Sequence, residues 1–428
     1  MKKRFFYISL YAVAFLFLFG FALAQKKDLT AKLSPQDARC YTCHKEIELL
    51  PKDFSENDAH RHANLACSSC HGGDPNSDDQ EIAMSPSKGF IGVPKKKDIP
   101  KFCGKCHSNI DFMRVYQPRI ATDQVSQYYT SLHGKKLLLG DENVADCSSC
   151  HSAHRILSAK DPRSTVYKLN VPNTCNKCHG NTDLMKKYNL SSSALEEYSK
   201  SVHGEALLKK KDLGAPACND CHGNHGAMPP GITSISHVCG TCHASNMEYF
   251  NTTKMARAFD EQDFHGCEQC HGYHAVLKPN DEMIGIGKES KCIDCHTEGD
   301  EGYTVSKKIY SSLTQLKNKY DAANAKYLEV RQKGMNDVEI GFQLQDARQA
   351  LIQSRTLIHT FDSIKVGAKA KEGIDISNKA SLLAQKEIDE YYTRRNGFAI
   401  ATLAFLVFII ALYFKIKDKE KNKTTSNS

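Results

Sequence analysis

Cysteine pairs with a histidine directly behind the second member recur nine times in this chain of 428 residues. Each motif reads Cys-x-x-Cys-His, and together the nine motifs use all 18 cysteines. This is the spacing of c-type haem attachment, in which two thiols form thioethers with the porphyrin and the adjoining histidine binds the iron from its proximal side. The sequence therefore predicts nine covalently attached haem c groups. The attaching cysteines are Cys40 and Cys43, Cys67 and Cys70, Cys103 and Cys106, Cys147 and Cys150, Cys175 and Cys178, Cys218 and Cys221, Cys239 and Cys242, Cys267 and Cys270, and Cys292 and Cys295. The proximal ligands would be His44, His71, His107, His151, His179, His222, His243, His271 and His296.

Two other kinds of site also use paired cysteines, namely zinc ribbons and thioredoxin-like redox pairs. Neither needs a histidine at the next position, and only 19 of the 428 residues are histidine. Chance therefore does not explain a histidine behind all nine pairs, and haem attachment is the favoured interpretation. No cysteine remains for a disulfide or a free thiol.

Ten histidines lie outside the motifs and are candidates for the distal position on the irons. They are His60, His62, His133, His154, His203, His225, His237, His265, His274 and His359. Three of them stand three residues behind a proximal histidine, namely His154, His225 and His274. A histidine so near on the same local helix cannot reach the opposite face of its own haem, so we expect these three to bind the irons of neighbouring haems. The alternative is a surface histidine or one that hydrogen-bonds to a haem propionate.

The other distal candidates differ in how regular their surroundings are. Four end segments that recur ahead of the paired motifs, namely His60, His133, His203 and His265. His62 and His237 have less regular surroundings. His359 lies on the apolar side of a predicted helix, where it is either a haem ligand or a histidine satisfied within that helix.

The number of distal ligands decides between two functions. If every iron carries two imidazoles, none has an open position for a substrate, and the chain transfers electrons without catalysing a reaction itself. If one iron lacks its distal ligand, a small nitrogen or sulfur compound could bind there, and the chain would be an enzyme. Ten candidates for nine irons favour electron transfer.

The motifs form a lone first site followed by four paired sites, and the segment Tyr128–Gly134 recurs at Tyr198–Gly204. With about thirty residues of chain for each haem, the polypeptide cannot build an ordinary apolar core, so the porphyrins must supply most of the buried surface. We therefore expect a mostly α fold with much irregular loop, in which a nine-haem cytochrome domain occupies residues 25–300.

Long helices are expected behind the last motif. Residues 304–392 contain no proline and place apolar residues at helical spacing, which predicts a helical hairpin or three-helix stalk over residues 301–396. We expect one break at residues 334–337 and another at residues 367–375. Residues 397–414 carry no charge and are long enough for a single transmembrane helix, with a buried soluble helix as the alternative.

The two chain ends indicate export and anchoring. A basic start, an apolar stretch and Ala22-Leu23-Ala24 predict a signal peptide over residues 1–24, with an uncleaved anchor as the alternative. The lysine-rich tail, residues 415–428, predicts a cytoplasmic C-terminus with the haem domain on the periplasmic side of the cytoplasmic membrane.

The net charge of +8 does not indicate a nucleic-acid partner. Most of that charge belongs to the signal peptide and to the basic tail, which leaves the exported part nearly neutral. Ionised haem propionates would then make the exported domain acidic. We expect its lysines to pair locally with propionates.

The doubled motifs, with the CxxCHxxH variants, resemble periplasmic multihaem cytochromes c of the doubled-CxxCH class over residues 40–296. The proline-free helices that follow are similar to the C-terminal helices of pentahaem nitrite reductases and octahaem hydroxylamine oxidoreductases. Nitrite reductases usually carry a CxxCK haem, and no motif here ends in lysine. We therefore expect an anchored cytochrome that takes electrons from a quinol-oxidising membrane complex and passes them to periplasmic or surface reductases. The alternative is a multihaem reductase or dehydrogenase of nitrogen or sulfur compounds.

Overall fold

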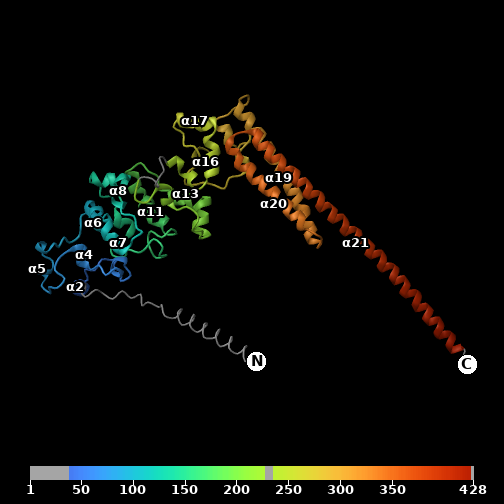
Figure 1. The fold of residues 1–428 in the computed structure, drawn as a ribbon, viewed down its shortest axis with the longest axis horizontal. Helices are drawn as coiled ribbons and strands as arrows, with labels where there is room; N and C mark the ends of the chain where they lie inside the picture. The colour runs from blue at the N-terminus through green and yellow to red at the C-terminus, as the bar shows by residue number, and fades with distance from the viewer. Residues whose placement is uncertain (1–37, 227–234, 426–428) are drawn as a thin grey trace, which may run out of the picture. The chain divides into compact units, whose positions relative to one another are not determined.

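The structure, a computed structural model, describes residues 38–226 and 235–425. Within these ranges the regular elements are helices, and no strand is present. Most of the helices are short and alternate with loops, whereas the three at the C-terminus are long (Figure 1). The expected fold class, mostly α with much irregular loop, is confirmed. The predicted signal peptide, residues 1–24, lies outside the described residues.

The chain divides into two compact units. Unit 1 comprises Met1–Ile235 together with His274–Val276, and unit 2 comprises Ser236–Tyr273 together with Leu277–Ser428. The long C-terminal helices thus group with the segments that carry the last three motifs.

Unit 1 is built from short helices around very small apolar clusters. Its helices are α2 (Ala38–Glu46), α3 (Ala59–His62), α4 (Cys67–His71), α5 (Gln80–Ala83), η1 (Pro86–Lys88), η2 (Lys96–Asp98), α6 (Ile99–His107), α7 (Ile110–Tyr116), α8 (Gln124–Thr130), α9 (Leu132–Leu138), α10 (Cys147–His151), α11 (Val171–His179), α12 (Thr182–Lys186), α13 (Ala194–Lys200), α14 (Val202–Gly204), η3 (Glu205–Lys209) and α15 (Cys218–His222). One cluster centres on Leu137 and another on Leu207. Clusters of this size cannot by themselves stabilise a domain of more than 200 residues, which agrees with a fold built around additional groups.

The repeated serine and glycine of the recurring segment each have a structural reason. The Ser131 Oγ caps α9 by accepting from the Gly134 N–H at 3.0 Å, and the Ser201 Oγ accepts from the Gly204 N–H at 2.9 Å. A Cβ added at Gly134 would lie 2.1 Å from the Tyr128 carbonyl oxygen, so only glycine fits there. The same arrangement in both copies places His133 and His203 at equivalent positions one residue behind the first helical residue.

Unit 2 ends in a bundle of three helices with its own core. Its elements are η4 (Ile235–Thr241), α16 (Ala244–Asn251), α17 (Lys254–Glu261), α18 (Glu268–His271), η5 (Asp281–Met283), η6 (Cys292–Asp294), α19 (Glu301–Gln332), α20 (Val338–Leu357), η7 (Ile358–Thr360) and α21 (Ser363–Thr425). Helices α19, α20 and α21 bury apolar residues along their length, and Leu313, Leu316 and Val366 are fully buried. Ionic contacts also join the haem-motif segment to the bundle, because the Arg355 guanidinium binds both carboxylate oxygens of Asp281, at 2.8 and 2.7 Å.

The helix breaks agree with the sequence at one position and differ at the other. The break at residues 334–337 is present, because α19 ends at Gln332 and α20 begins at Val338. The expected break at residues 367–375 is wrong, since α21 runs through it and the turn lies earlier, at η7 and Phe361. Gly373 serves packing instead. A Cβ added there would lie 2.7 Å from the Leu316 Cδ1, so the absent side chain lets the helices approach closely.

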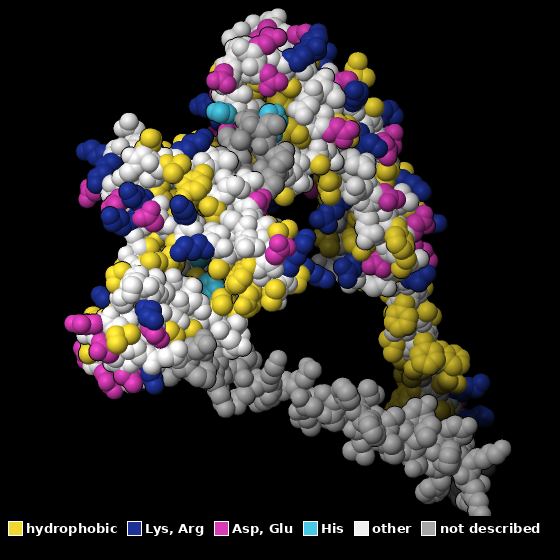
Figure 2. Space-filling model, turned by 60° about the vertical axis from the view of Figure 1, so that its left-hand side comes forward, with side chains coloured by type: hydrophobic (Ala, Val, Ile, Leu, Met, Phe, Trp, Pro, Cys, Tyr) yellow, Lys and Arg dark blue, Asp and Glu magenta, His cyan; other side chains and the backbone are white. Residues whose placement is uncertain are grey.

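Helix α21 continues well beyond the bundle (Figure 1). The last buried core residue on α21 is Ile388, and the residues of 397–414 are exposed and apolar. Their hydrophobic side chains form an exposed stretch along the helix in Figure 2. By length and composition, this helix could cross a membrane.

Candidate haem sites

Each CxxCH segment in α4, α10 and α15 is one short helix of five residues. Residues i, i+3 and i+4 of a helix share one face, so both thiols and the imidazole point to the same side. Helix α10 starts at a capping box in which Asp146 accepts from the Ser149 N–H and Ser149 accepts from the Asp146 N–H, each at 3.1 Å. The helices end at Gly72, Ser152 and Gly223, each with a positive φ. Caps and turn together hold the motif in the shape that a single porphyrin requires.

Six proximal histidines each face a predicted distal histidine. The pairs, with the distances between ring centroids, are His60 and His107 at 6.0 Å, His71 and His154 at 6.2 Å, His133 and His179 at 6.1 Å, His151 and His225 at 6.1 Å, His222 and His274 at 6.0 Å, and His271 and His359 at 6.3 Å. The angles between the ring planes vary from 8° to 73°, whereas the distances hardly vary.

This distance fits a haem iron between the two rings. A metal–imidazole nitrogen bond is about 2.0 Å long and the ring centre lies about 1.1 Å further back, so two axial imidazoles have centroids about 6.2 Å apart. An axial ring can rotate about its metal bond, so the angle between the rings is not fixed. The six pairs therefore share the distance between ring centroids that ligation of one iron by two histidines requires.

The pairs follow a rule along the sequence. A histidine that ends a recurring segment faces the proximal histidine of the second motif in the same pair of motifs, as His60 faces His107 and His133 faces His179. A histidine in the CxxCHxxH variant instead faces the first motif of the preceding pair. Thus His154 faces His71, His225 faces His151, and His274 faces His222.

His359 takes the corresponding place for the last pair of motifs. It lies in η7 between α20 and α21 and faces His271, the proximal histidine of the motif at Cys267. The turn that presents it contains Phe361 with φ 48°, in the left-handed region, and the Phe361 ring packs against Phe250 at 6.3 Å. The C-terminal bundle thus supplies an imidazole that no further CxxCHxxH motif is present to supply.

Protein acceptors hold the Nδ1 atom of several of these rings. His71 Nδ1 donates to the Gly92 carbonyl at 2.8 Å, and His359 Nδ1 donates to the Thr356 carbonyl at 3.0 Å. Carboxylates take this role at three further distal candidates: His60 beside Asp58 at 3.4 Å, His154 beside Asp53 at 3.2 Å, and His274 beside Glu197 at 3.6 Å. A ring whose Nδ1 is engaged in this way has its Nε2 available for a metal.

Burial favours the neutral form of the paired rings, which is the form that binds a metal. It is the main cause that lowers the pKa of eight of them, namely His107, His133, His151, His179, His222, His225, His271 and His359.

Five candidates show no such pairing in the described part of the chain. They are His44, His62, His237, His265 and His296. His62 and His237 are exposed, and the His265 side chain is 59% exposed with its Nδ1 3.9 Å from Glu268. His296 Nδ1 lies 3.3 Å from the Asp300 carboxylate. The two remaining candidates are His203 in α14 and His243 at the start of α16.

The attaching thiols of successive motifs lie side by side. The thiols of Cys103 and Cys147, of Cys175 and Cys218, and of Cys239 and Cys267 are close neighbours. Within one pair of motifs, burial and the nearby Cys175 raise the pKa of the Cys150 thiol to about 11. The sulfurs therefore place neighbouring attachment sites next to one another, from Cys103 to Cys218 in unit 1 and from Cys239 to Cys292 in unit 2.

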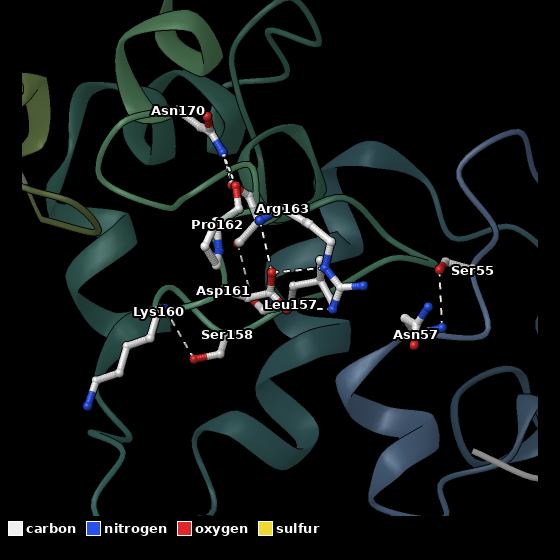
Figure 3. Close-up of polar contacts among 10 residues, drawn as sticks. Ser55, Asn57, Leu157, Ser158, Lys160, Asp161, Pro162, Arg163 and Asn170 are labelled. Atoms are coloured by element: carbon white, nitrogen blue, oxygen red, sulfur yellow. Dashed lines mark hydrogen bonds and ion pairs between the residues drawn. The ribbon is translucent and has the colours of Figure 1, made fainter. Parts of the chain in front are cut away.

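The loop from α10 to α11 is fixed by its own polar contacts (Figure 3). Arg163 binds Asp161 through two nitrogens, at 3.0 and 2.8 Å, and the Asn170 amide donates to the Pro162 carbonyl at 2.8 Å. Thr165 Oγ1 donates to the Cys150 carbonyl at 2.5 Å, so the same loop connects the motif of α10 with that of α11. The short connection keeps these two attachment sites at a fixed separation.

Methionine is another side chain that can bind haem iron axially, through its thioether sulfur. Met113 and Met185 stand at matching positions of α7 and α12, where Asn109 and Asn181 cap the helices by accepting a backbone N–H at 3.0 and 2.9 Å. Both methionines are buried in unit 1. The two methionines therefore fill equivalent buried positions in the two repeated segments.

Two family models match the sequence. The model described as cytochrome c3 matches residues 59–180, and the model described as cytochrome c554 and c-prime matches residues 21–72 and 238–317. The chain is a multihaem c-type cytochrome. Eight of the nine motifs lie in the matched residues, and the remaining one begins at Cys218. This cytochrome carries covalently bound haem c and functions in electron transfer. No curated protein and no solved structure matches the chain.

The sequence interpretation missed the residues that hold the distal rings. Asp53, Asp58 and Glu197 were not singled out, although Asp58 lies two residues before His60 in a segment that recurs at residues 259–265. Asp58 is buried, and its Oδ2 accepts from the Ile156 N–H at 2.6 Å. A carboxylate two residues before a repeated histidine was a usable signal. Asp53 had none, because its contacts lie about a hundred positions further along the chain.

Proposed function

We propose that the chain is a membrane-anchored nonahaem cytochrome that transfers electrons on the outer face of the cytoplasmic membrane. It would accept them from a quinol-oxidising membrane complex and deliver them to periplasmic or surface reductases. The observation that carries the proposal is the set of six facing imidazole pairs, each at the separation of two axial ligands.

Paired imidazoles favour transport over catalysis. Haem iron supplies one-electron reduction and oxidation when it is bound, and histidine on both faces leaves no position for a substrate. The proximal rings of the six pairs belong to the motifs at Cys67, Cys103, Cys147, Cys175, Cys218 and Cys267. These residues hold their cofactors rigidly, which suits repeated electron transfer with little rearrangement.

The contacts between thiols support an ordered path. In unit 1 the attachment sites adjoin one another from Cys103 through Cys147 and Cys175 to Cys218. In unit 2 they adjoin from Cys239 to Cys267, and the Cys270 thiol lies near Cys292. Electrons entering at one site of a unit can therefore leave at another without crossing solvent.

The C-terminal helix bears on how a membrane partner could reach the haem attached at Cys267. From Ser363 to Gly397, α21 extends about 50 Å before its apolar segment begins. The His359 site stands at the far end of that stretch. This chain has no histidine within residues 397–414 that could bind a haem inside the bilayer, so a partner subunit would have to bring the electrons to the outer face. The basic tail would lie in the cytoplasm.

Mass spectrometry and electron paramagnetic resonance of the purified full-length protein test the proposal. We expect nine attached haems and low-spin ferric signals for the irons of the six paired sites. Redox titration should show reversible one-electron steps, and reduced protein should be oxidised by an acceptor protein at a rate that falls with added salt. Zinc or far fewer haems would contradict the cofactor assignment. A dominant high-spin signal, or turnover of nitrite or hydroxylamine, would contradict a transport role.

A further inference from the structure

Asp53 gathers four donors from a segment that lies about a hundred residues further along the chain. Its Oδ2 accepts from the Ser152 hydroxyl at 2.7 Å, from the Ala153 N–H at 2.9 Å and from the His154 N–H at 3.1 Å. Its Oδ1 faces the His154 Nδ1 at 3.2 Å. Because a carboxylate only accepts, the imidazole donates, and one side chain fixes both the backbone and the ring of His154.

The turn at Ser152 makes these contacts possible. Ser152 follows α10 with φ 69°, in the left-handed region, so the backbone N–H groups of the next two residues point to the same side. Asp53 occupies that side, and its carboxylate accepts all of these hydrogen bonds. A full negative charge therefore stands beside the His154 ring.

The ring held in this way is parallel to its partner. His154 and His71 have centroids 6.2 Å apart and planes only 10° apart. His71 Nδ1 donates to the Gly92 carbonyl, so both rings of this pair have Nδ1 engaged and Nε2 available. The pair therefore combines one ring on a charged acceptor with one ring on a neutral acceptor.

A second pair in the same chain provides the comparison. The distal ring of the Cys267 site, His359, donates its Nδ1–H to a neutral backbone carbonyl, that of Thr356. A carboxylate draws the Nδ1 proton more strongly than a carbonyl does and makes the imidazole a more basic ligand. A more basic axial ligand stabilises the ferric iron relative to the ferrous iron.

We propose that Asp53 sets the redox potential of the haem at Cys67 and Cys70, lowering it through the hydrogen bond to His154 Nδ1. This inference rests on the proposed ligation of that haem by His71 and His154. Asp53 is a positioning residue, since it acts on the iron only through the ring. Asp53 would thus give this one haem of the path a lower redox potential than ligation by two histidines provides without it.

The test is Asp53→Asn in the full-length holoprotein, studied by spectroelectrochemical titration and electron paramagnetic resonance. Asparagine keeps the size of the side chain but removes the charge. We expect nine attached haems, an unchanged number of low-spin irons, and one component whose reduction constant rises about tenfold, which is about 59 mV for one electron. Asp53→Glu restores the charge and should return that component toward its original potential.

The matched control is Asp161→Asn, which removes the same charge from the segment that follows His154. Asp161 binds Arg163 and not an imidazole (Figure 3), so no component should move. An equal shift in both variants would overturn the inference, because it would reflect net charge alone. Unshifted components in Asp53→Asn, or a new high-spin iron, would also overturn it, since Asp53 would then serve only the packing.

His154→Ala separates this inference from the proposed function. If the ligation is correct, that variant contains one new high-spin iron, and Asp53→Asn added to it moves no further component. If His154→Ala leaves all irons low-spin, the axial assignment fails. If His154→Ala produces the high-spin iron but Asp53→Asn shifts nothing, the axial assignment stands and only the role of Asp53 is refuted.

Discussion

Five of the paired imidazoles, His60, His71, His154, His274 and His359, have a protein acceptor beside their Nδ1 atom. The acceptors come from three sources: a loop carbonyl at Gly92, the preceding helical turn at Thr356, and carboxylates such as Asp53. None of these acceptors lies in a haem motif. The motifs therefore determine where a haem is attached, whereas residues elsewhere in the chain determine how its ligands are oriented and how basic they are.

Replacing His359 tests the least regular ligand assignment. In His359→Ala the iron at the Cys267 site should lose its distal imidazole, so the full-length protein should show a high-spin signal of about one iron in nine. Electron paramagnetic resonance of the oxidised protein measures this. Ile364→Ala, whose side chain is 82% exposed nearby on α21, should keep the original spectrum. An unchanged spectrum in His359→Ala would mean that His359 is a helix histidine satisfied by Thr356 alone.

Gly134 can be tested at the same scale. In Gly134→Ala the new Cβ would lie 2.1 Å from the Tyr128 carbonyl oxygen, and the backbone beside His133 must shift. We expect the free energy of unfolding to fall by about 2 kcal/mol or more, as measured by denaturant titration. Gly287→Ala should have little effect, because no atom lies within 4 Å of its added Cβ. Equal stability of the two variants would contradict this account of the repeated glycine.

At the scale of elements, the spacing of residues along the sequence predicted the structure correctly where the signal is local. The CxxCHxxH spacing predicted that His154, His225 and His274 serve neighbouring haems, and in the structure each faces the proximal histidine of the preceding pair of motifs. The helix break at residues 334–337 is also a local signal and is present. The break expected at 367–375 is absent because the glycine there serves contacts with α19 and α20, which a pattern along one helix does not contain.

Two glycines of α21, Gly367 and Gly373, should respond to substitution in opposite directions. Gly367→Ala meets only the Ser312 Oγ at 3.7 Å and should stabilise the bundle by up to about 1 kcal/mol through higher helix propensity. Gly373→Ile must displace Leu316 and should destabilise the bundle by about 2 kcal/mol. Thermal unfolding followed by circular dichroism measures both. A stabilised Gly373→Ile variant would show that the close approach of the helices is not required.

At the scale of the whole molecule, the two units differ in what stabilises them. Unit 1 has only small apolar clusters, whereas unit 2 contains a bundle with continuous buried positions from Ile309 to Val330 along α19. Chain produced without haem attachment should therefore keep the helical signal of the bundle and lose cooperative folding elsewhere. Limited proteolysis should then degrade residues before 301 first. Equal protease resistance of both parts would contradict a haem-dependent fold.

Removing the apolar segment tests the anchor. A chain that ends at Arg395 retains α19, α20 and the packed part of α21, so it should bind its haems and should be released into the soluble fraction. Fractionation followed by haem staining measures this. The full-length protein should remain in the membrane, and its tail should resist protease added to intact spheroplasts. Cleavage of the tail from outside would reverse the proposed orientation.

The position of His359 has a consequence for biogenesis. The ring that faces His271 is contributed from η7, the turn between α20 and α21, and it follows every attachment motif in the order of synthesis. The site at Cys267 is therefore completed only after the turn between α20 and α21 has been synthesised and has docked. A truncated or stalled polypeptide would present an unfinished iron centre, which gives quality-control proteases a chemical mark for incomplete copies.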